Sequence, residues 1–329
     1  MAAYDVCIDI GEMPILVHTD SAEFAHLLED RYGSFVVGAG PSADASSEGP
    51  APGDHQGGPC RPGRAQGPRR VFELEVELVP PGIVSDAEEA RVRLEGRRWV
   101  MERSDFRAEW VPERRQGWVR QSPNPYSIDA VLRILHSLVL AREGGFLVHA
   151  ASAIRNGRAF LFAGASGAGK TTISRLAPPD VVVLTDEISY VRPWKQRTGN
   201  REQVIGNSSA QGLGDEGQGI LPSLFPVPSS LFPAYEAFGT PFTGELARIG
   251  ENLRAPVAAL YLLTQGAGNR IEAISHAEAA RGLLQNILFF AQDEELVRLV
   301  FQSAFDFVSR VPVRRLVFAQ DARAWELIG

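Results

Sequence analysis

The stretch that decides the fold is FLFAGASGAGKTT, at residues 160–172. It contains the spacing G-x-x-x-x-G-K-T, from Gly164 to Thr171, which is typical of a loop that binds nucleotide phosphates. The flanking sequence favours this interpretation, because an apolar, strand-like run precedes the loop and TTISRLA can begin a helix after it. The structural alternative is a glycine-rich turn that opens a helix and carries a solvated lysine.

Each part of this loop has a physical role in binding phosphate. Glycine permits backbone conformations that a side chain would disfavour, so successive N–H groups can point into one concavity. The start of the helix adds partial positive charge. Lys170 would supply an ammonium for the β- and γ-phosphates of ATP, and Thr171 a hydroxyl for Mg²⁺. The predicted nucleotide-binding residues are Gly164, Ala165, Ser166, Gly167, Ala168, Gly169, Lys170, Thr171 and Thr172.

A second motif follows in VVVLTDE, at residues 181–187. An apolar run that ends in Asp186 and Glu187 is typical of a strand that brings carboxylates beside bound phosphates, where Mg²⁺ must be held. We therefore predict a metal site made by Thr171, Asp186 and Glu187. The alternative is a strand that ends in solvent with two charges.

His149 lies in the strand-like run 146–154, which the hairpin signal Asn156-Gly157 joins to the run 158–164. In such a hairpin His149 could lie near the phosphates. A neutral ring could carry a proton there, and a charged ring could stabilise phosphate oxygens. The alternative is a hydrogen-bonded core histidine, which is the interpretation favoured for His18, His136 and His276.

The composition excludes several classes of protein. The chain has 329 residues, a formal net charge of -7 and a pI near 5.5, so no basic field indicates a nucleic-acid partner. No apolar run approaches the roughly 18 residues of a membrane span. The first residues lack the basic start of a signal peptide, and two cysteines fit a reducing compartment. We expect a cytoplasmic protein with no membrane partner.

The pattern changes near residue 125, where we place a domain boundary. Residues 1–125 predict an α+β N-terminal domain, interrupted by a Gly/Pro/Ser-rich insert at 38–69 that should be disordered. Residues 126–329 predict an α/β nucleotide-binding domain with a mixed sheet. Within it, the polar stretch 193–233 predicts a long flexible loop.

Two later segments carry further expectations. The segment FGTPFTGELAR, at 238–248, is either a connecting turn or a substrate or nucleotide loop in which Arg248 and Arg254 bind phosphate oxygens. The segment 293–310 predicts a helix. Its expected inward-facing residues are Leu296, Val297, Val300, Phe301, Ala304, Phe305 and Val308.

Residues 147–191, LVHAASAIRNGRAFLFAGASGAGKTTISRLAPPDVVVLTDEISYV, combine these features in one order. A histidine strand, a hairpin, a phosphate loop, a short helix and a strand ending in paired acids follow one another. This order resembles the HPr kinase/phosphorylase family. The likeness continues less specifically to about residue 328, whereas residues 1–125 do not match. The loop itself is also similar to that of ATP-dependent phosphoenolpyruvate carboxykinase, which shares the core fold.

The resemblance implies a P-loop kinase core of the HPr-kinase/carboxykinase type that uses ATP and Mg²⁺. It implies transfer of the γ-phosphate to a serine of a protein or peptide, and it allows a homo-oligomer. By the same resemblance, Lys170 is the phosphate lysine and His149 the active-site histidine. Asp186 is the base toward the acceptor hydroxyl, and Glu187 is the second acid, near the metal.

Two departures from the family pattern leave other functions open. Thr171-Thr172 stands where the family usually has Ser-Glu, and the family signature E-x-R-G-x-G is absent after the paired acids. The alternatives are a catalytically weak ATP-binding regulatory module and a small-metabolite kinase or carboxykinase relative. The leading expectation is an ATP-dependent kinase that acts on a serine hydroxyl.

Overall fold

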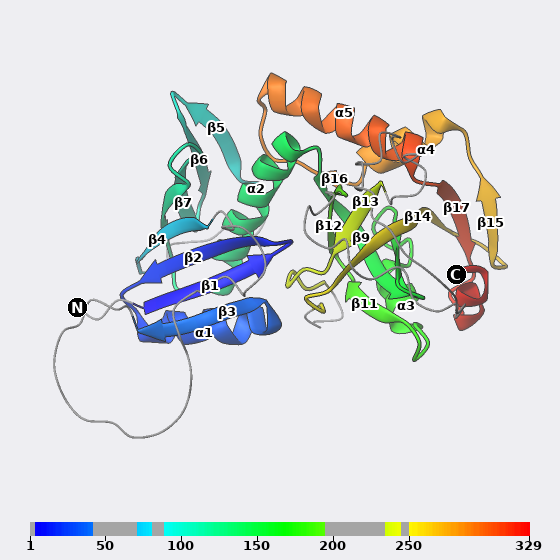
Figure 1. Cartoon of the computed structure of the whole chain (residues 1–329), viewed down its shortest axis with the longest axis horizontal. Coiled ribbons are helices and arrows are strands. Elements are labelled where there is room, and N and C mark those ends of the chain that lie inside the picture. Colours follow the sequence, from blue (N-terminus) through cyan, green and yellow to red (C-terminus); the bar gives the residue numbers. More distant parts are fainter. Residues whose placement is uncertain (1–3, 42–70, 81–88, 195–233, 245–249) are drawn as a thin grey trace, which may run out of the picture.

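The computed structural model describes residues 4–41, 71–80, 89–194, 234–244 and 250–329. Within these ranges the protein is a mixed α/β protein that consists mostly of strands. Two mixed sheets lie on either side of helix α2 (Pro125–Glu143), as Figure 1 shows. In the same ranges no helix combines the length and the apolar character needed to cross a membrane.

The first sheet comes from the chain before α2. Helix α1 (Ala22–Tyr32) begins at the N-cap Ser21, whose hydroxyl accepts from the Phe24 amide, and η1 (Gly33–Phe35) follows it. The strand order is β3-β1-β2-β4-β8-β7-β6-β5. These strands are β1 (Tyr4–Ile10), β2 (Met13–Thr19), β3 (Val36–Pro41), β4 (Phe72–Leu78), β5 (Arg91–Glu95), β6 (Arg98–Arg103), β7 (Phe106–Val111) and β8 (Gln116–Gln121).

Strand β3 corrects the expected start of the disordered insert. Residues 38–41, which begin the predicted insert 38–69, pair with β1 as part of β3. The composition is rich in glycine, but backbone pairing with a neighbouring strand needs no side chain. Residues 42–69 of the insert lie outside the described residues.

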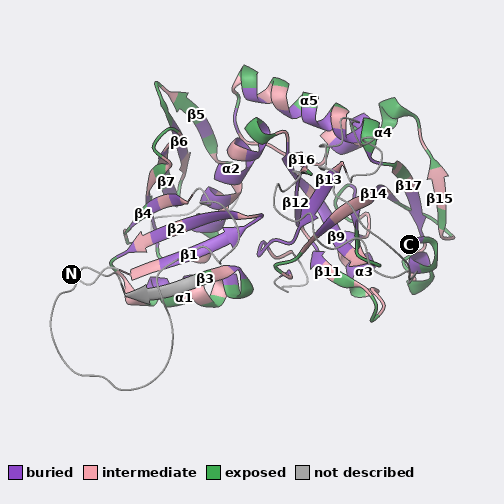
Figure 2. Ribbon diagram, in the orientation of Figure 1, coloured by how far each residue is buried: buried purple, intermediate pink, exposed green. Residues whose placement is uncertain are grey.

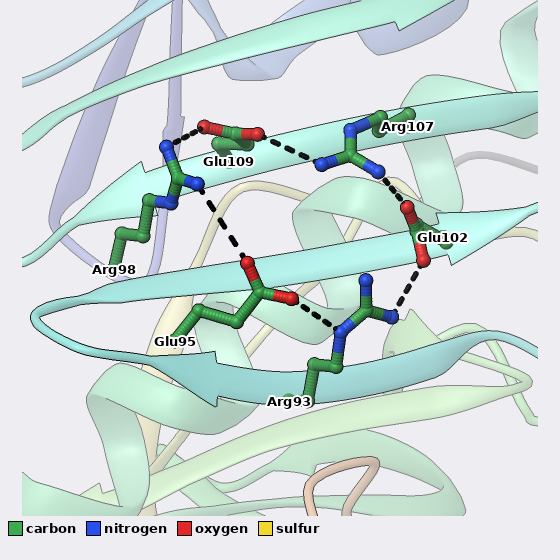
Figure 3. A network of polar contacts seen from close by, with 6 residues as sticks. All are labelled: Arg93, Glu95, Arg98, Glu102, Arg107 and Glu109. Carbon is green, nitrogen blue, oxygen red and sulfur yellow. Dashed lines mark hydrogen bonds and ion pairs between the residues drawn. The ribbon is translucent and has the colours of Figure 1, made fainter.

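The outer end of the first sheet carries a ring of alternating charges on strands β5, β6 and β7 (Figure 3). Its ion pairs have N–O separations of 2.6 to 3.6 Å, apart from the closer contact between Arg107 and Glu102. Such cross-strand pairs support the sheet, and charge on the edge strand β5 disfavours pairing with another chain. The members are Arg93, Glu95, Arg98, Glu102, Arg107 and Glu109.

The second sheet contains a closed ring of five strands. The pairing order β10-β9-β12-β13-β14 closes because β14 also pairs with β10, in parallel. Strands β17 and β15 extend the sheet from β14, and β11 and β16 pair with β9. The strands are β9 (Phe146–Arg155), β10 (Arg158–Ala163), β11 (Val182–Thr185), β12 (Ile188–Pro193), β13 (Tyr235–Phe238), β14 (Arg254–Gln265), β15 (Arg270–Ala273), β16 (Ile287–Leu288) and β17 (Val313–Phe318).

The second sheet confirms some of the features predicted from the sequence. The mixed sheet and the β9–β10 hairpin are confirmed, and both Asn156 and Gly157 have the positive φ that a tight hairpin turn needs. The sequence did not predict the closure of the ring. Of the predicted loop 193–233, Pro193 ends β12 and the Trp194 amide donates to the Ala234 carbonyl. Residues 195–233 lie outside the described residues.

Helices cover both faces of the second sheet. Helices α4 (His276–Leu284) and α5 (Glu294–Arg310) pack against one face, and α3 (Lys170–Arg175) and η3 (Ala322–Leu327) pack against another. The prediction for α5 was wrong in part, because Phe301 and Phe305 are exposed. Ser303 and Phe307 are buried in their place, because the side of the helix that carries these two residues packs against the sheet.

Helix α2 joins the two sheets into one apolar core. Buried residues concentrate in the strands of both sheets and along α2 (Figure 2). One continuous cluster contains Ile8 of the first sheet, Leu135 of α2, and Tyr190 and Phe238 of the second sheet. The predicted boundary near residue 125 therefore coincides with a change of sheet but not with a break in the core.

Ion pairs cross the same interface. The Arg192 guanidinium of β12 contacts Glu12 at 2.5 Å and Glu236 at 3.2 Å, and it donates to the Gly11 carbonyl at 3.0 Å. Glu12 lies at the tip of the β1–β2 hairpin, where its positive φ of 61° turns the chain. Arg254 of β14 adds a second cation, with Nη1 2.7 Å from a Glu12 carboxylate oxygen.

His136 lies in the centre of α2 with no exposed surface. Its ring packs edge-on against the Tyr190 ring, with the ring centroids 5.6 Å apart. Neither ring nitrogen has a hydrogen-bond partner in the described part of the chain. The expected core histidine is therefore buried but not hydrogen-bonded, and burial lowers its pKa to about 3.

The pKa of His136 predicts a loss of stability in acid. In the unfolded chain a histidine titrates near pH 6.5, whereas the folded protein keeps this ring neutral down to about pH 3. Below about pH 6.5 the unfolded state therefore binds one more proton than the folded state. The free energy of unfolding should fall by up to about 1.4 kcal/mol per pH unit from this group alone.

We expect His136→Phe to remove that part of the pH dependence. Urea unfolding of parent and variant between about pH 6.5 and 4 measures the difference in slope. His276→Phe is the control, because His276 is exposed. Parallel stability curves for the parent and His136→Phe would contradict the prediction.

Candidate functional site

Strand β9 positions the predicted site residues, because its pairing partners change at His149. Residues 146–149 pair with β12 along one edge, and Leu147 and Val148 pair with β16 along the other. Beyond His149, β11 replaces β12 and β10 replaces β16. The bend between β11 and β12 contains Asp186 and Glu187, and β10 leads into the loop 164–169. The chain thus brings three separate sequence motifs together at the centre of β9.

The glycine-rich loop is held between β10 and α3. Gly167 and Gly169 have φ of 78° and 110°, which favours glycine at both positions. A Cβ on Gly169 would also lie 2.9 Å from the Phe318 ring of β17. The Gln265 amide of β14 donates to the Gly167 carbonyl at 2.6 Å. The ends of three strands therefore fix the shape of the loop.

Lys170 is buried beneath this loop, with 7% of its surface exposed. Its ammonium donates to the Gly164 carbonyl at 2.9 Å and to the Ala165 carbonyl at 3.3 Å. Thr171 and Thr172, which follow it in α3, are half-buried. The chain contains only two lysines, at 170 and 195, so a lysine inside this loop is not a product of composition.

Glu187 and His149 form a close pair, with Glu187 Oε1 3.3 Å from His149 Nε2. Both side chains are about one-third exposed, at 31% and 34%. The hydrogen bond with His149 lowers the pKa of Glu187, and the charges of Arg133 and Lys170 lower it further. Glu187 is therefore ionised near neutral pH.

Asp186 is almost fully buried, with 3% of its surface exposed. Its Oδ1 accepts from the Gly244 amide at 3.2 Å. Thr185, the preceding residue, accepts from the Glu187 amide through its hydroxyl. These contacts fix the two carboxylates on a short bend instead of leaving them at a solvated strand end.

Residues 238–244, here called the strap, cover the two acids. The Thr240 hydroxyl donates to the Ile188 carbonyl at 2.6 Å. A Cβ on Gly244 would lie 2.7 Å from a Glu187 carboxylate oxygen and 3.0 Å from one of Asp186. Residues 238–244 of FGTPFTGELAR thus lie beside the two acids, whereas residues 245–248 lie outside the described residues.

The contacts of Arg254 do not favour the phosphate role considered for it. Arg254 is a partner of Glu12 and Glu236, with N–O distances of 2.7 and 3.5 Å, and lies in β14. Its charge is therefore used at the interface between the sheets. Arg248 lies outside the described residues.

Sequence reasoning missed two residues at the site. Gly244 resembles any turn glycine until the strap is folded onto Asp186. Arg133 of α2 lies with its guanidinium carbon 4.9 Å from the Phe242 ring centroid, and its charge acts on Glu187. The available signal was an arginine within the apolar stretch VLRILHSLVL, residues 131–140.

The arrangement fits a nucleotide with Mg²⁺ in its donor chemistry. A glycine-shaped loop with a buried ammonium suits phosphate oxygens, and two carboxylates beside hydroxyl groups suit a hard cation. Among the described residues no group of three or more His, Cys, Asp and Glu side chains could hold a metal ion by itself. Mg²⁺ is usually bound by one or two carboxylates together with substrate phosphates, so two acids are sufficient.

Comparisons with known proteins add no family assignment. No protein-family model matches the chain. No curated protein matches it either. The resemblance to HPr kinase/phosphorylase therefore depends on the motif residues alone.

The effect of His149 on the pKa of Glu187 can be tested by substitution. We expect His149→Phe to raise this pKa, because the hydrogen bond from His149 is the largest cause of its lowering. The rise should be incomplete, since Arg133 and Lys170 remain. Carboxyl-detected NMR titration measures it, with His18→Phe, in the first sheet, as the control. An unchanged Glu187 titration would show that the pair does not form.

Close packing of the backbone against Leu184 and Thr240 predicts a strong effect of substitution at Gly250. A Cβ there would lie 1.8 Å from the Leu184 carbonyl and 2.6 Å from the Thr240 carbonyl, both backbone atoms. We expect Gly250→Ala to lower the free energy of unfolding by about 3 kcal/mol. At Gly268 an added Cβ meets nothing within 4 Å, so Gly268→Ala should shift stability by less than about 1 kcal/mol. Equal urea midpoints for the two variants would contradict this account.

Proposed function

We propose that this protein is an ATP-dependent kinase that transfers the γ-phosphate to a serine hydroxyl of a protein or peptide. One observation carries the proposal. Motifs chosen from separate parts of the sequence lie around one pair, in which Glu187 Oε1 is 3.3 Å from His149 Nε2 and the charge of Lys170 lowers the Glu187 pKa. A structural turn and a solvated strand end would not bring these groups together.

The proposal extends to the architecture. The nine-stranded sheet, with its loop between β10 and α3, would serve as a kinase core of the HPr-kinase/carboxykinase type. Its support is the order of the elements from β9 to β12, which follows the resemblance described for residues 147–191. The first sheet would then be an addition specific to this chain.

The loop would bind the phosphates of ATP. Lys170 already donates to two loop carbonyls and would exchange these for β- and γ-phosphate oxygens. Asp186, Glu187 and Thr171 would hold Mg²⁺, which supplies charge neutralisation on the phosphate oxygens. Because the chain has only two lysines, an ATP analogue that acylates amines can be mapped to Lys170 without ambiguity.

Asp186 would act as the base toward the acceptor. The serine oxygen forms a bond to the γ-phosphorus as the bond between that phosphorus and the bridging oxygen of ADP breaks. ADP leaves with the bonding electron pair, and the hydroxyl proton passes to the Asp186 carboxylate. The Gly244 amide, which donates to Asp186 Oδ1, would keep the carboxylate oriented during this step.

The test uses purified protein, γ-labelled ATP and a panel of serine-containing peptides and proteins. We expect both Lys170→Ala and Asp186→Asn to lower transfer by about a hundredfold or more, because each removes a group that contacts the reacting phosphate or hydroxyl. Arg158→Ala, at an exposed position in β10, is the matched control. Transfer by Lys170→Ala or Asp186→Asn at the parent rate would sink the site assignment.

A second function is favoured by one residue. Thr172 stands where the resembling family has a glutamate, which removes one acid from the site. The chain could then be an ATP-binding regulatory module that presents a surface to a partner without phosphorylating it. That function requires tight ATP binding with no transfer to any acceptor, so a single phosphorylated acceptor excludes it.

A further inference from the structure

A pocket of about 680 Å³ opens between α2 and the chain that follows α4. Leu288, Phe289 and Phe290 contribute an apolar wall. The charged residues of the lining are Glu89, Arg103, Asp129 and Arg133, of which Glu89 is exposed. Ligand pockets commonly measure roughly 300–1,000 Å³. The volume is therefore suited to a short segment of a ligand and is too small for the face of a folded protein.

The pocket adjoins the His149–Glu187 pair from two directions. On one side, the His149 amide donates to the Asn286 carbonyl at 2.7 Å, and the next two residues form β16. On the other side, the Arg133 guanidinium lies against Phe242 of the strap, and the Gly244 amide of the strap donates to Asp186. A ligand in the pocket would therefore extend toward the two acids.

The charged side chains of the pocket differ in whether they have ion-pair partners. Asp129 accepts from Arg31 at 2.6 Å and from the Tyr32 hydroxyl at 2.7 Å. Arg103, also in the pocket wall, binds the Asp105 carboxylate through two nitrogens at 2.5 and 2.8 Å. Both of these charges are compensated within the first part of the chain.

Arg133 differs from them. Its Nε is buried and has no hydrogen-bond partner among the residues that the structure describes. Its guanidinium contacts an aromatic ring in place of a carboxylate. Burying a guanidinium without a carboxylate partner is costly, and an incoming carboxylate would offset that cost through N–H···O bonds to the Nη atoms, which are not among the fully buried ones.

We infer that this pocket binds the peptide segment that flanks the acceptor serine, with a carboxylate of the peptide against Arg133 and an apolar side chain against Leu288–Phe290. The inference rests on the proposed function, since it names the substrate class of the same site. The carboxylate belongs to an Asp or Glu near the serine or to the peptide C-terminus. Arg133 would thus determine specificity, whereas Asp186 would act on the hydroxyl.

The test measures peptide binding separately from phosphoryl transfer. The probes are fluorescein-labelled serine peptides with leucine and a single Glu, which is moved through each position near the serine. Each has matched Gln and Lys versions, with either a free or an amidated C-terminus. Anisotropy titrations use the full chain with a non-hydrolysable ATP analogue. Transfer from ATP to the same peptides is assayed in parallel.

We expect the parent to bind one or more carboxylate peptides at least about tenfold more tightly than their amide counterparts. Arg133→Gln should abolish this preference, Arg133→Lys should restore part of it, and Arg158→Gln should leave it intact. The Gln and amidated versions distinguish a side-chain carboxylate from the C-terminus. Circular dichroism confirms that each variant is folded.

A second variant protects the test against misfolding of Arg133→Gln. Ala130 also lines the pocket, so Ala130→Phe should fill it and weaken binding of the carboxylate peptides while leaving binding of the ATP analogue unchanged. Unaltered peptide binding by Ala130→Phe would overturn the inference.

The outcomes separate the inference from the proposed function. Equal binding of carboxylate, amide and lysine peptides, or binding of none, overturns the inference whether or not transfer occurs. Transfer that ignores neighbouring acids keeps the kinase proposal and rejects this pocket. Carboxylate preference that depends on Arg133 but is accompanied by no transfer keeps the pocket and rejects the kinase.

Discussion

The double-sided pairing of strand β9 is the constraint on which the candidate site depends. Its two halves pair with different strands, and the change occurs at His149 on both edges. The bend that contains Asp186 and Glu187 is forced at this point because β11 and β12 share one edge of β9. A strand that paired with one neighbour along its whole length would leave no such bend, and the two acids would continue an ordinary ladder.

The strap completes the candidate site by packing closely over Asp186 and Glu187. Gly239 in the strap and Gly250 beside it allow backbone to approach backbone, and Gly244 allows the strap to approach the two carboxylates. Asp186 is consequently shielded from water while Glu187 keeps a partly exposed contact with His149. The same bend thus holds one buried carboxylate, Asp186, and one partly solvent-exposed carboxylate, Glu187. That asymmetry gives the two adjacent acids different environments.

The features that sequence could predict are local ones. The Asn156-Gly157 turn, the loop 164–169 and the paired acids each carry their own signal within a few residues. The parallel pairing of β10 with β14 and the contact of Gly244 with Asp186 join distant segments, and no local pattern marks them. Helix α5 illustrates the limit differently: Phe301 and Phe307 belong to overlapping apolar stripes, and only the position of the sheet decides which stripe is buried.

The ion pairs at the tip of the β1–β2 hairpin balance charge between the two sheets. Arg192 and Arg254 bring two positive charges to an interface where the second sheet contributes one carboxylate, Glu236. Glu12 of the first sheet contributes the other. Neither part of the chain balances its own charge at this interface, so a division at residue 125 would separate counter-ions as well as apolar surfaces. The first sheet thus supplies a counter-ion, Glu12, for the arginines of the second sheet.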